Sequence, residues 1–549
     1  MSKSGSSIFS VLVLVAALRG ADAQAREGGV PHLRTQGTAT QLVVDGAPFL
    51  ILGGELGNSS ASSLEYLRPF WPKLRAMHLN TVLAPVYWEL IEPAERRFNF
   101  ATVDSLLTDA RANNMRLVLL WFGSWKNSMS SYAPAWVKTN QSRFPRTEAT
   151  RGHGQEILSP FVEANADADS RAFAALMRHL REVDGSRHTV LMVQVENEIG
   201  MIPEARDHSA LADSLFDRAV PDSLMRYLAR HRAELAPSLG ARWDSAGAKT
   251  SGTWQDVFGR GPHTDELFMA WHFARYAERV AASGKSEYPL PMYVNAALIR
   301  PGYVPGQYVS AGPLPHLADV WRAAAPSIDL LAPDIYFPNF VEWTGNYAHS
   351  GNPLFIPEVR LDAHTPVEAV YAIGAHDAIG FSPFAIESAS EADAARLGRV
   401  YEMLGQLAPL ILREQGRGTM TAVIPPVSFD GTVDDSPRRV SVGGAFTSTV
   451  SFEAPPTQSA GPRPLGGGLI IALAPDELLI AGSGIVVTFE PTGSGDPIAG
   501  ILSAQEGRYA NGRWQPGRWL NGDQTHQGRH VRLPPGEFSM QRVKLYRYR

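Results

Sequence analysis

Eight short apolar runs alternate with helix-like segments through most of the first 410 residues, and this alternation constrains the fold most strongly. The runs lie at residues 49–54, 81–86, 116–122, 189–195, 291–296, 328–335, 353–356 and 378–383. Apolar runs of this kind are typical of parallel strands buried on both faces, and most are followed by a segment with helical period. The pattern predicts an α/β fold of the (β/α)8 TIM barrel type.

The sequence changes character near residue 415. Beyond that point it is rich in Gly and Pro, with short β-type runs at residues 440–442, 469–473 and 484–489 and a hairpin signal at Asn521-Gly522. We therefore predict a C-terminal antiparallel β-sandwich domain over residues 415–549. The barrel would span residues 41–414, with a less regular insertion at about 201–262, and residues 24–40 would form an irregular leader. A chain of 549 residues has room for both domains.

The N-terminus has the pattern of a secretory signal. Lys3 precedes an apolar segment at residues 8–18, and Ala21-Asp22-Ala23 supplies small residues for cleavage. We predict a cleaved signal peptide at residues 1–23 and a periplasmic or secreted bacterial protein without membrane contact after cleavage. An uncleaved anchor is the alternative, although the apolar segment is too short to span a bilayer. The chain has no cysteine, which excludes disulfides and a cysteine nucleophile.

The composition limits the classes of molecule that this chain is expected to bind. The net charge of −5, from 50 basic and 55 acidic residues, indicates no basic surface, so nucleic acid is not an expected partner. There is no His-Glu-x-x-His zinc motif, and we predict neither a cofactor nor a metal. Twelve Trp and sixteen Tyr are compatible with a carbohydrate partner, because aromatic faces stack on the apolar faces of sugar rings, although most aromatics belong to cores. The oligomeric state stays open, a homodimer included.

Two glutamates occupy matched positions. Glu198 follows the fourth apolar run, and Glu358 follows the seventh. The carboxyl ends of barrel strands meet at one mouth, so the two side chains are expected to share a cleft. Paired carboxylates of this kind hydrolyse glycosidic bonds, and about 5–5.5 Å between them is typical of the retaining mechanism. We predict Glu198 as acid/base and Glu358 as nucleophile, although either alone would pass for an ordinary glutamate at a loop start.

Neighbouring residues suggest supporting roles. Asn197 can donate a hydrogen bond to a sugar 2-hydroxyl, and Tyr336, after the sixth run, can donate to Glu358. Glu196 is a rival for the acid/base role, because side chains two positions apart face the same side of a strand.

Several segments together resemble a known family. They are Pro85-Val86-Tyr87-Trp88-Glu89, Leu120-Trp121-Phe122-Gly123-Ser124-Trp125-Lys126-Asn127 and Val195-Glu196-Asn197-Glu198. The chain resembles bacterial glycoside hydrolase family 35 β-galactosidases, which are retaining clan A barrel glycosidases, with an extra C-terminal β domain. The resemblance implies an exo-acting, retaining enzyme that removes terminal β-D-galactosyl residues from oligo- or polysaccharide fragments, xyloglucan-derived ones among them.

Sugar recognition departs from the family pattern. Many members carry a Glu after strand three, where this chain has none, and Glu89, Glu55, Lys126 or Asn127 would have to replace it. We expect at least one of the tryptophans near strand ends to stack on sugar and the others to pack the rim. The predicted substrate-binding residues are Asn197, Tyr336, Tyr87, Trp88, Glu89, Trp121, Trp125 and Asn127. The missing acid keeps alternatives open: a β-glucosidase or endo-glycanase on the same barrel, or a non-catalytic carbohydrate-binding protein.

Overall fold

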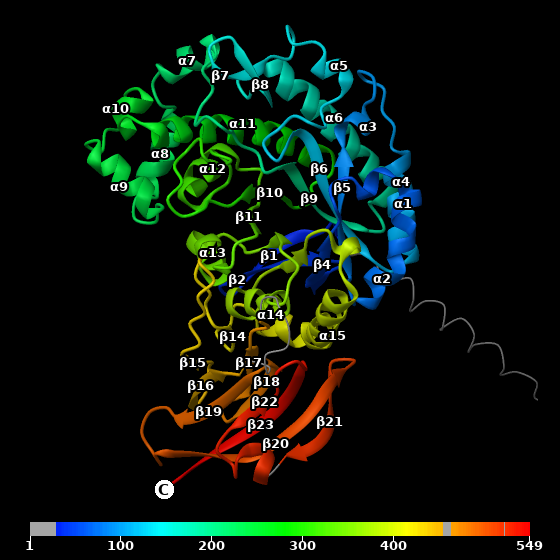
Figure 1. Cartoon of the computed structure of the whole chain (residues 1–549), viewed down its shortest axis with the longest axis vertical. Helices are drawn as coiled ribbons and strands as arrows, with labels where there is room; N and C mark the ends of the chain where they lie inside the picture. The colour runs from blue at the N-terminus through cyan, green and yellow to red at the C-terminus, as the bar shows by residue number, and fades with distance from the viewer. Residues whose placement is uncertain (1–28, 454–462, 521) are drawn as a thin grey trace, which may run out of the picture.

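The barrel is closed and parallel. The structure, a computed structural model, describes residues 29–453, 463–520 and 522–549, so the predicted signal peptide lies outside the described residues (Figure 1). Eight strands close in the order β10-β11-β12-β13-β4-β5-β6-β9, which confirms the TIM barrel. Each overlaps one predicted run: β4 (Ile51–Glu55), β5 (Thr81–Tyr87), β6 (Arg116–Lys126), β9 (Val190–Asn197), β10 (Met292–Ala297), β11 (Leu330–Ile335), β12 (Ile356–Val359) and β13 (Gly380–Pro383).

Helices surround the barrel. The helical segment after β4 is divided at Pro69 and Pro72, because proline is accommodated in the first turn of a helix but not in its interior. The helices before the insertion are α1 (Leu64–Leu67), α2 (Trp71–Ala76), α3 (Trp88–Ile91), α4 (Ala101–Ala112), α5 (Ala135–Lys138) and α6 (Glu163–Asp184). The later helices are α11 (Pro262–Glu287), α12 (Ala318–Ala324), α13 (Phe340–Tyr347), α14 (Thr365–His376) and α15 (Glu391–Glu414).

The insertion is more helical than expected. It forms α7 (Ala210–Phe216), α8 (Asp222–Arg230), α9 (Pro237–Ser245) and α10 (Trp254–Phe258). Of these, α8 packs on the outer helix α12 and α10 packs on α11, and the insertion lies at the upper left of Figure 1, away from the C-terminal sheets. A hairpin of β7 (Arg146–Thr150) and β8 (His153–Leu158) lies between α5 and α6 in the chain.

The segment predicted as an irregular leader, of which residues 24–28 lie outside the described residues, forms β-strands from residue 32 onward. Strands β1 (His32–Gln36), β2 (Ala39–Val44) and β3 (Ala47–Phe49) form an antiparallel sheet. The side-chain amides of Gln36 and Gln41 donate to the carbonyl of Leu412, at 3.0 and 2.6 Å. These bonds satisfy a carbonyl that the end of α15 leaves without a helical partner. The segment is therefore held in part by polar side chains that cap a helix. Such contacts produce no periodic pattern of apolar residues, so the sequence did not indicate these strands.

Two antiparallel sheets form the C-terminal domain and confirm the predicted β-sandwich. One sheet has the order β14-β17-β18-β23-β20-β21 and the other β15-β16-β19-β22, with an apolar core of their own. The strands are β14 (Met420–Val423), β15 (Arg438–Ser441), β16 (Phe446–Phe452), β17 (Gly467–Ala474), β18 (Glu477–Ser483), β19 (Ile485–Pro491), β20 (Ile498–Ala510), β21 (Arg513–Leu520), β22 (Val531–Leu533) and β23 (Ser539–Tyr548).

The hairpin expected at Asn521-Gly522 is wrong. Asn521 lies outside the described residues, Gly522–Thr525 is a 3-10 helix, and β22 pairs with β19. The tight hairpin between β20 and β21 instead turns at Asn511-Gly512, whose φ angles are 51° and 70°. Both values are positive, as a type I′ turn requires.

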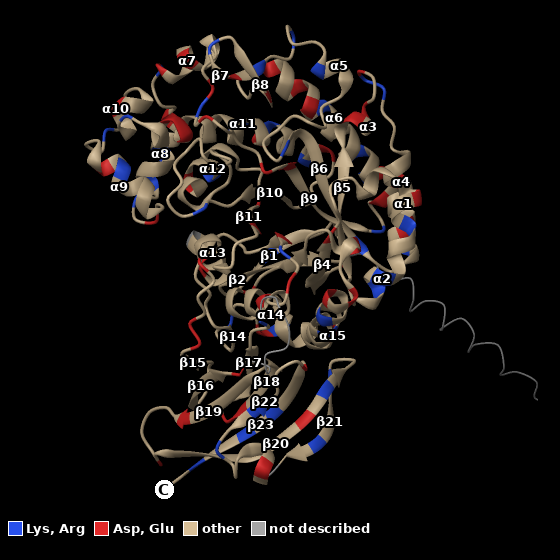
Figure 2. Ribbon diagram, viewed as in Figure 1, with Lys and Arg blue, Asp and Glu red and all other residues tan. Residues whose placement is uncertain are grey.

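Charged residues are interspersed over the molecule in the view of Figure 2. Two of the basic residues along β23 have acidic partners: Arg542 pairs with Glu477, and the Nζ of Lys544 lies 3.8 Å from Asp476. The third, Arg547, donates to the backbone carbonyls of Ala445 and Thr492. Within the part of the chain that the structure describes, no helix is both long enough and apolar enough to cross a membrane.

Gly416 and Gly37 join the N-terminal sheet to the end of α15. A Cβ on Gly416 would lie 1.9 Å from the carbonyl oxygen of Gln36, and its φ is +71°. Helices α14 and α15 lie between the barrel and the C-terminal sheets, so this contact supports the joint between the domains (Figure 1).

We predict that Gly416→Ala lowers the free energy of unfolding by about 3 kcal/mol or more, because a left-handed backbone and a backbone clash coincide. Gly418→Ala is the matched control, since Gly418 has a φ of +70° but open space around its Cα. It should cost about 1 kcal/mol. Urea denaturation followed by circular dichroism measures both, and equal losses would contradict the role of the contact.

Candidate active site

Four acidic side chains meet at the carboxyl ends of the barrel strands. Glu55 ends β4, Glu198 follows β9, Asp334 lies in β11 and Glu358 lies in β12. All four are buried, and the register of the parallel strands pairs Asp334 with Glu358. The two predicted catalytic glutamates therefore lie at one mouth, as the strand count indicated.

A chain of hydrogen bonds connects them across neighbouring strands. The backbone N–H of Glu198 donates to Oδ1 of Asn295 on β10, at 3.0 Å. The Nδ2 of Asn295 donates in turn to Oδ2 of Asp334, at 2.7 Å. Asp334 is the strand partner of Glu358, so the backbone around Glu198 is fixed relative to the strand that carries Glu358.

Glu358 is held with one oxygen occupied. The hydroxyl of Tyr336 donates to its Oε1, the contact expected from the position of Tyr336, while Oε2 has no hydrogen-bond partner among the described residues. Burial and the charge of Glu198 raise the pKa of Glu358 to about 7, against the opposing effects of Lys126 and Tyr336. Glu358 therefore ionises near neutral pH, with one oxygen held by Tyr336 and the other buried near Glu55.

Glu55 and Asp334 are neighbouring carboxyls with unused hydrogen-bonding capacity. Neither oxygen of Glu55, nor Oδ1 of Asp334, has a partner within the described residues. Burial, followed by the Glu358 charge, raises the pKa of both carboxyls well above their usual range. Lys126 is buried beside them, and its charge opposes these shifts.

Glu196 and Glu198 point to different places. The carboxylate of Glu196 accepts from the backbone N–H of Trp125 at 2.8 Å, and burial together with Asp169 raises its pKa well above the usual range. Asp169 belongs to α6, outside the barrel, so Glu196 faces away from Glu358. Both glutamates have positive φ, 62° and 45°, and this irregular backbone breaks the alternation that made Glu196 a rival.

Two asparagines flank Glu198. Asn127, whose φ is 50°, donates to Oε2 of Glu198. Asn197 is buried, and neither its Oδ1 nor its Nδ2 has a partner within the described residues. Left-handed backbone at non-glycine residues costs about 1–3 kcal/mol each and is concentrated at functional sites. The strain around Glu198 therefore supports this end of β9 as the site.

The three tryptophans predicted to bind substrate are buried in the core. Trp88, Trp121 and Trp125 are fully buried, so none presents a ring face to a sugar, contrary to the expected stacking platform. The indole of Trp88 donates to Glu92, and that of Trp121 donates to Asp169. Trp125 packs edge-on against Phe273 and Tyr276.

Tyr87 and Glu89 are not joined to the acids either. Tyr87 is buried and donates to the backbone carbonyl of Asn58, at 2.8 Å. Glu89 is half-buried on α3, and no hydrogen bond joins its side chain to the four acids in the described part of the chain. Within residues 29–453, 463–520 and 522–549, no group of three or more His, Asp or Glu side chains is placed to hold a metal ion.

Asn295 and Asp334 are the site residues that the sequence did not single out. Asn295 is the only amide in β10, and Asp334 is the only charged residue in β11. A polar side chain inside an otherwise apolar barrel strand was the available signal, because such a group is buried at a cost unless it has a function or a partner.

Comparisons with known proteins point to the same kind of site. A β-galactosidase family model, that of glycoside hydrolase family 42, matches residues 70–258, which include Glu198 and stop before Glu358. The match is not to family 35, and the comparisons give that finer assignment no support. A second model, a domain of unknown function named DUF5597, matches residues 397–532.

The relatives cover the chain only in part. A β-galactosidase from Xanthomonas manihotis is 31% identical over 215 residues, which cover 37% of this chain; the match spans only 32% of that protein's length. The β-galactosidase structure from Marinomonas ef1 has a TM-score of 0.46 at 11% identity, covering 69% of this chain and 62% of that one. The structure from Rahnella sp. R3 has a TM-score of 0.44 at 15% identity, covering 66% and 57%. Since both scores lie below 0.5, the fold assignment rests on the strand order of the barrel itself.

The raised pKa of Glu55 gives a prediction about stability. An unfolded glutamate ionises near pH 4.3, whereas folded Glu55 keeps its proton to higher pH. Above pH 4 the folded state thus binds more protons, and stability falls as pH rises towards the folded pKa. Glu55→Gln removes this loss. The free energy of unfolding of the variant minus that of the wild type should therefore rise by about 1 kcal/mol or more from pH 5 to pH 8.

Urea midpoints at the two pH values measure this change. Glu402→Gln, at an exposed position on α15, is the control. Its urea midpoint should differ from that of the wild type by the same amount at both pH values. A Glu55→Gln effect that does not vary with pH would show that the buried carboxyl does not titrate as described.

Proposed function

We propose that this chain is a β-galactosidase that hydrolyses its substrate with retention of anomeric configuration. The observation that carries the proposal is the hydrogen-bonded chain from Glu198 through Asn295 to Asp334, beside Glu358, which holds two carboxylates at one barrel mouth. The β-galactosidase family model and the Xanthomonas relative support the same activity. Because the chain spans about a third of that relative, the activity is proposed from the site and the partial matches together.

In the first step, Oε2 of Glu358 attacks the anomeric carbon, and the glycosidic bond breaks as Glu198 gives its proton to the leaving oxygen. This oxygen of Glu358 suits the role because the other one is occupied by Tyr336. The product is a galactosyl ester of Glu358 and a free aglycone. Asn197 has an unused amide for the sugar 2-hydroxyl, a bond that strengthens in the transition state.

In the second step, Glu198 takes a proton from water, which attacks the anomeric carbon and releases Glu358. Two inversions give overall retention. Asn127 orients Glu198 throughout by donating to its Oε2. Lys126 and Tyr336 favour the ionised form of Glu358, which both the attack and the departure need.

We assign recognition of the galactose hydroxyls to Glu55, Asp334 and Lys126. Each is buried at the mouth, and the two carboxyls have unpartnered oxygens. A carboxyl with a raised pKa can donate as well as accept a hydrogen bond, which suits sugar hydroxyls. This set would replace the acid that family 35 members carry after strand three.

We further propose exo action on galactosylated fragments, xyloglucan-derived ones included, in the periplasm or outside the cell. The support is the N-terminal sequence pattern, since secreted glycosidases meet polysaccharide fragments there. Galactose specificity is tested by comparing nitrophenyl β-galactoside with the β-glucoside, the β-mannoside and the α-arabinoside. We expect the highest kcat/KM for the β-galactoside, and a clear preference for another glycone would overturn the galactose assignment.

The roles of the two glutamates predict opposite rescue products. Glu358→Ala should lower kcat by at least about a thousandfold, and added azide should restore turnover and give the α-galactosyl azide. Glu198→Ala should be rescued with a β-galactosyl azide product, because Glu358 still forms the ester. Proton NMR of the azides distinguishes the anomers.

Glu65→Ala, at an exposed position on α1, serves as the control and should keep wild-type kcat. Near-normal activity in Glu358→Ala would show that the nucleophile is another residue. The same azide anomer from both variants would show that the two roles are assigned wrongly.

A further inference from the structure

A large cavity lies between the barrel and the C-terminal domain, beside the acidic site. Its volume is about 660 Å³, within the range of pockets that enclose a whole ligand. The barrel contributes loops that follow β11 and β12, and the C-terminal domain contributes the segment between β14 and β15. Tyr336, which donates to Glu358, is part of its wall, so one side chain of the joint cavity also contacts the proposed nucleophile.

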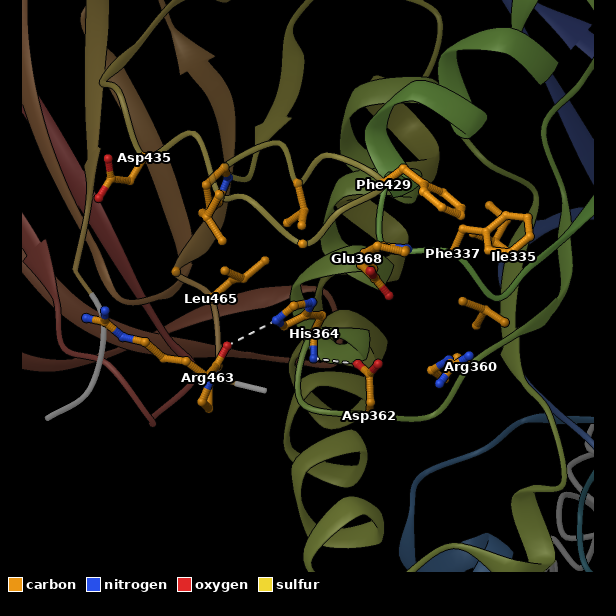
Figure 3. Close-up of a pocket in the computed structure, with 18 of the residues that line it drawn as sticks. Ile335, Phe337, Arg360, Asp362, His364, Glu368, Phe429, Asp435, Arg463 and Leu465 are labelled. Atoms are coloured by element: carbon orange, nitrogen blue, oxygen red, sulfur yellow. Dashed lines mark hydrogen bonds between the residues drawn. The ribbon is translucent and has the colours of Figure 1, made fainter. Parts of the chain in front are cut away.

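One end of the joint cavity carries an aromatic pair from the two domains. Phe337, after β11, and Phe429, from the C-terminal domain, pack edge to face with ring centroids 5.2 Å apart (Figure 3). Phe429 keeps 37% of its surface exposed. Its loop is closed by a bridge between Val427 and Val433, which fixes the position of the ring. An exposed, fixed ring beside a cavity offers a face for the apolar side of a sugar.

The other walls carry polar groups with free hydrogen-bonding capacity. Glu368 is more than nine-tenths buried, its side chain has no hydrogen bond among the described residues, and it lies amid the lining side chains in Figure 3. Arg360 has no ion pair within the described chain and follows Glu358 by two residues. His364 binds the backbone carbonyl of Arg463 at 3.1 Å across the joint, which holds the two domains around the space.

The balance of charge indicates a neutral ligand. Basic and acidic side chains line the cavity in similar numbers: Arg300, Arg360 and Arg463 against Asp362, Glu368, Asp435 and Glu453. Neither an anionic nor a cationic ligand is favoured by such a wall, whereas hydroxyl groups can bond to both kinds of side chain. Planar guanidinium and carboxylate groups beside an aromatic ring suit a sugar chain.

We propose that the joint cavity binds the aglycone of the substrate, a neutral oligosaccharide whose terminal galactose lies between Glu198 and Glu358. This inference rests on the proposed function. The galactose occupies the barrel mouth, so the chain attached to it must leave over the rim, where the loops after β11 and β12 open into the cavity. The C-terminal domain then selects substrates by holding the leaving group.

The experiment compares a minimal leaving group, fluoride, with oligosaccharide leaving groups of increasing length. The leaving group of β-galactosyl fluoride is a single atom, which is too small to extend from the barrel mouth into the cavity. Galactosyl-capped neutral oligosaccharides with aglycones of one, two and three sugars reach progressively further into it. In the wild type, kcat/KM should rise about tenfold along the series, because remote binding energy lowers the barrier at the reacting centre.

Phe429→Ala should abolish this rise and leave kcat/KM for β-galactosyl fluoride within twofold of wild type. Trp519→Ala removes a ring that is 61% exposed on β21, away from the cavity. It should leave kcat/KM unchanged for the fluoride and for the oligosaccharides. No length dependence in the wild type would overturn the inference, as would an equal loss for both substrates in Phe429→Ala. Failure of the proposed function is distinct, because wild-type enzyme would then not hydrolyse β-galactosyl fluoride at all.

Discussion

The burial of four acidic side chains around one lysine is the constraint on which the site depends. Burial raises the pKa of Glu55, Asp334 and Glu358, and electrostatic repulsion from neighbouring carboxylates raises it further. Lys126 offsets only part of this repulsion. The arrangement is costly for stability and useful for chemistry, because it keeps proton donors beside a carboxylate that ionises near neutral pH.

Local backbone geometry decides which glutamate takes part. A regular strand would send Glu196 and Glu198 to the same face, and Glu196 would compete for the site. Positive φ at both residues turns Glu196 towards α6 and Glu198 towards the mouth. Hydrogen bonds from Asn127 and to Asn295 hold this strained segment in place, so the strain is a property of the site rather than of the strand.

The C-terminal domain is joined to the barrel through α14, α15 and the N-terminal sheet. Gln36 and Gln41 cap the end of α15, and the same region turns the chain into β14. This joint leaves space next to Tyr336 instead of filling it, and a fixed loop places Phe429 in that space. The domain is thus positioned to influence what the barrel mouth accepts.

The sequence by itself determined the barrel and the strand-end positions of Glu198 and Glu358. Buried parallel strands have continuous apolar sequences, and their order along the chain gives each strand its position in the barrel. It also indicated that Tyr336 could reach Glu358. It could not show that Trp88, Trp121 and Trp125 are buried, since an aromatic ring at a strand end has the same local pattern in a core and in a cleft. For the same reason Asn521-Gly522 and Asn511-Gly512 look alike, yet the described structure closes the β20–β21 hairpin at the latter pair. Only the tertiary structure decided the grouping of Glu55, Lys126, Asn295 and Asp334 and the cavity beside them, because contacts between distant strands and domains depend on packing that no local pattern records.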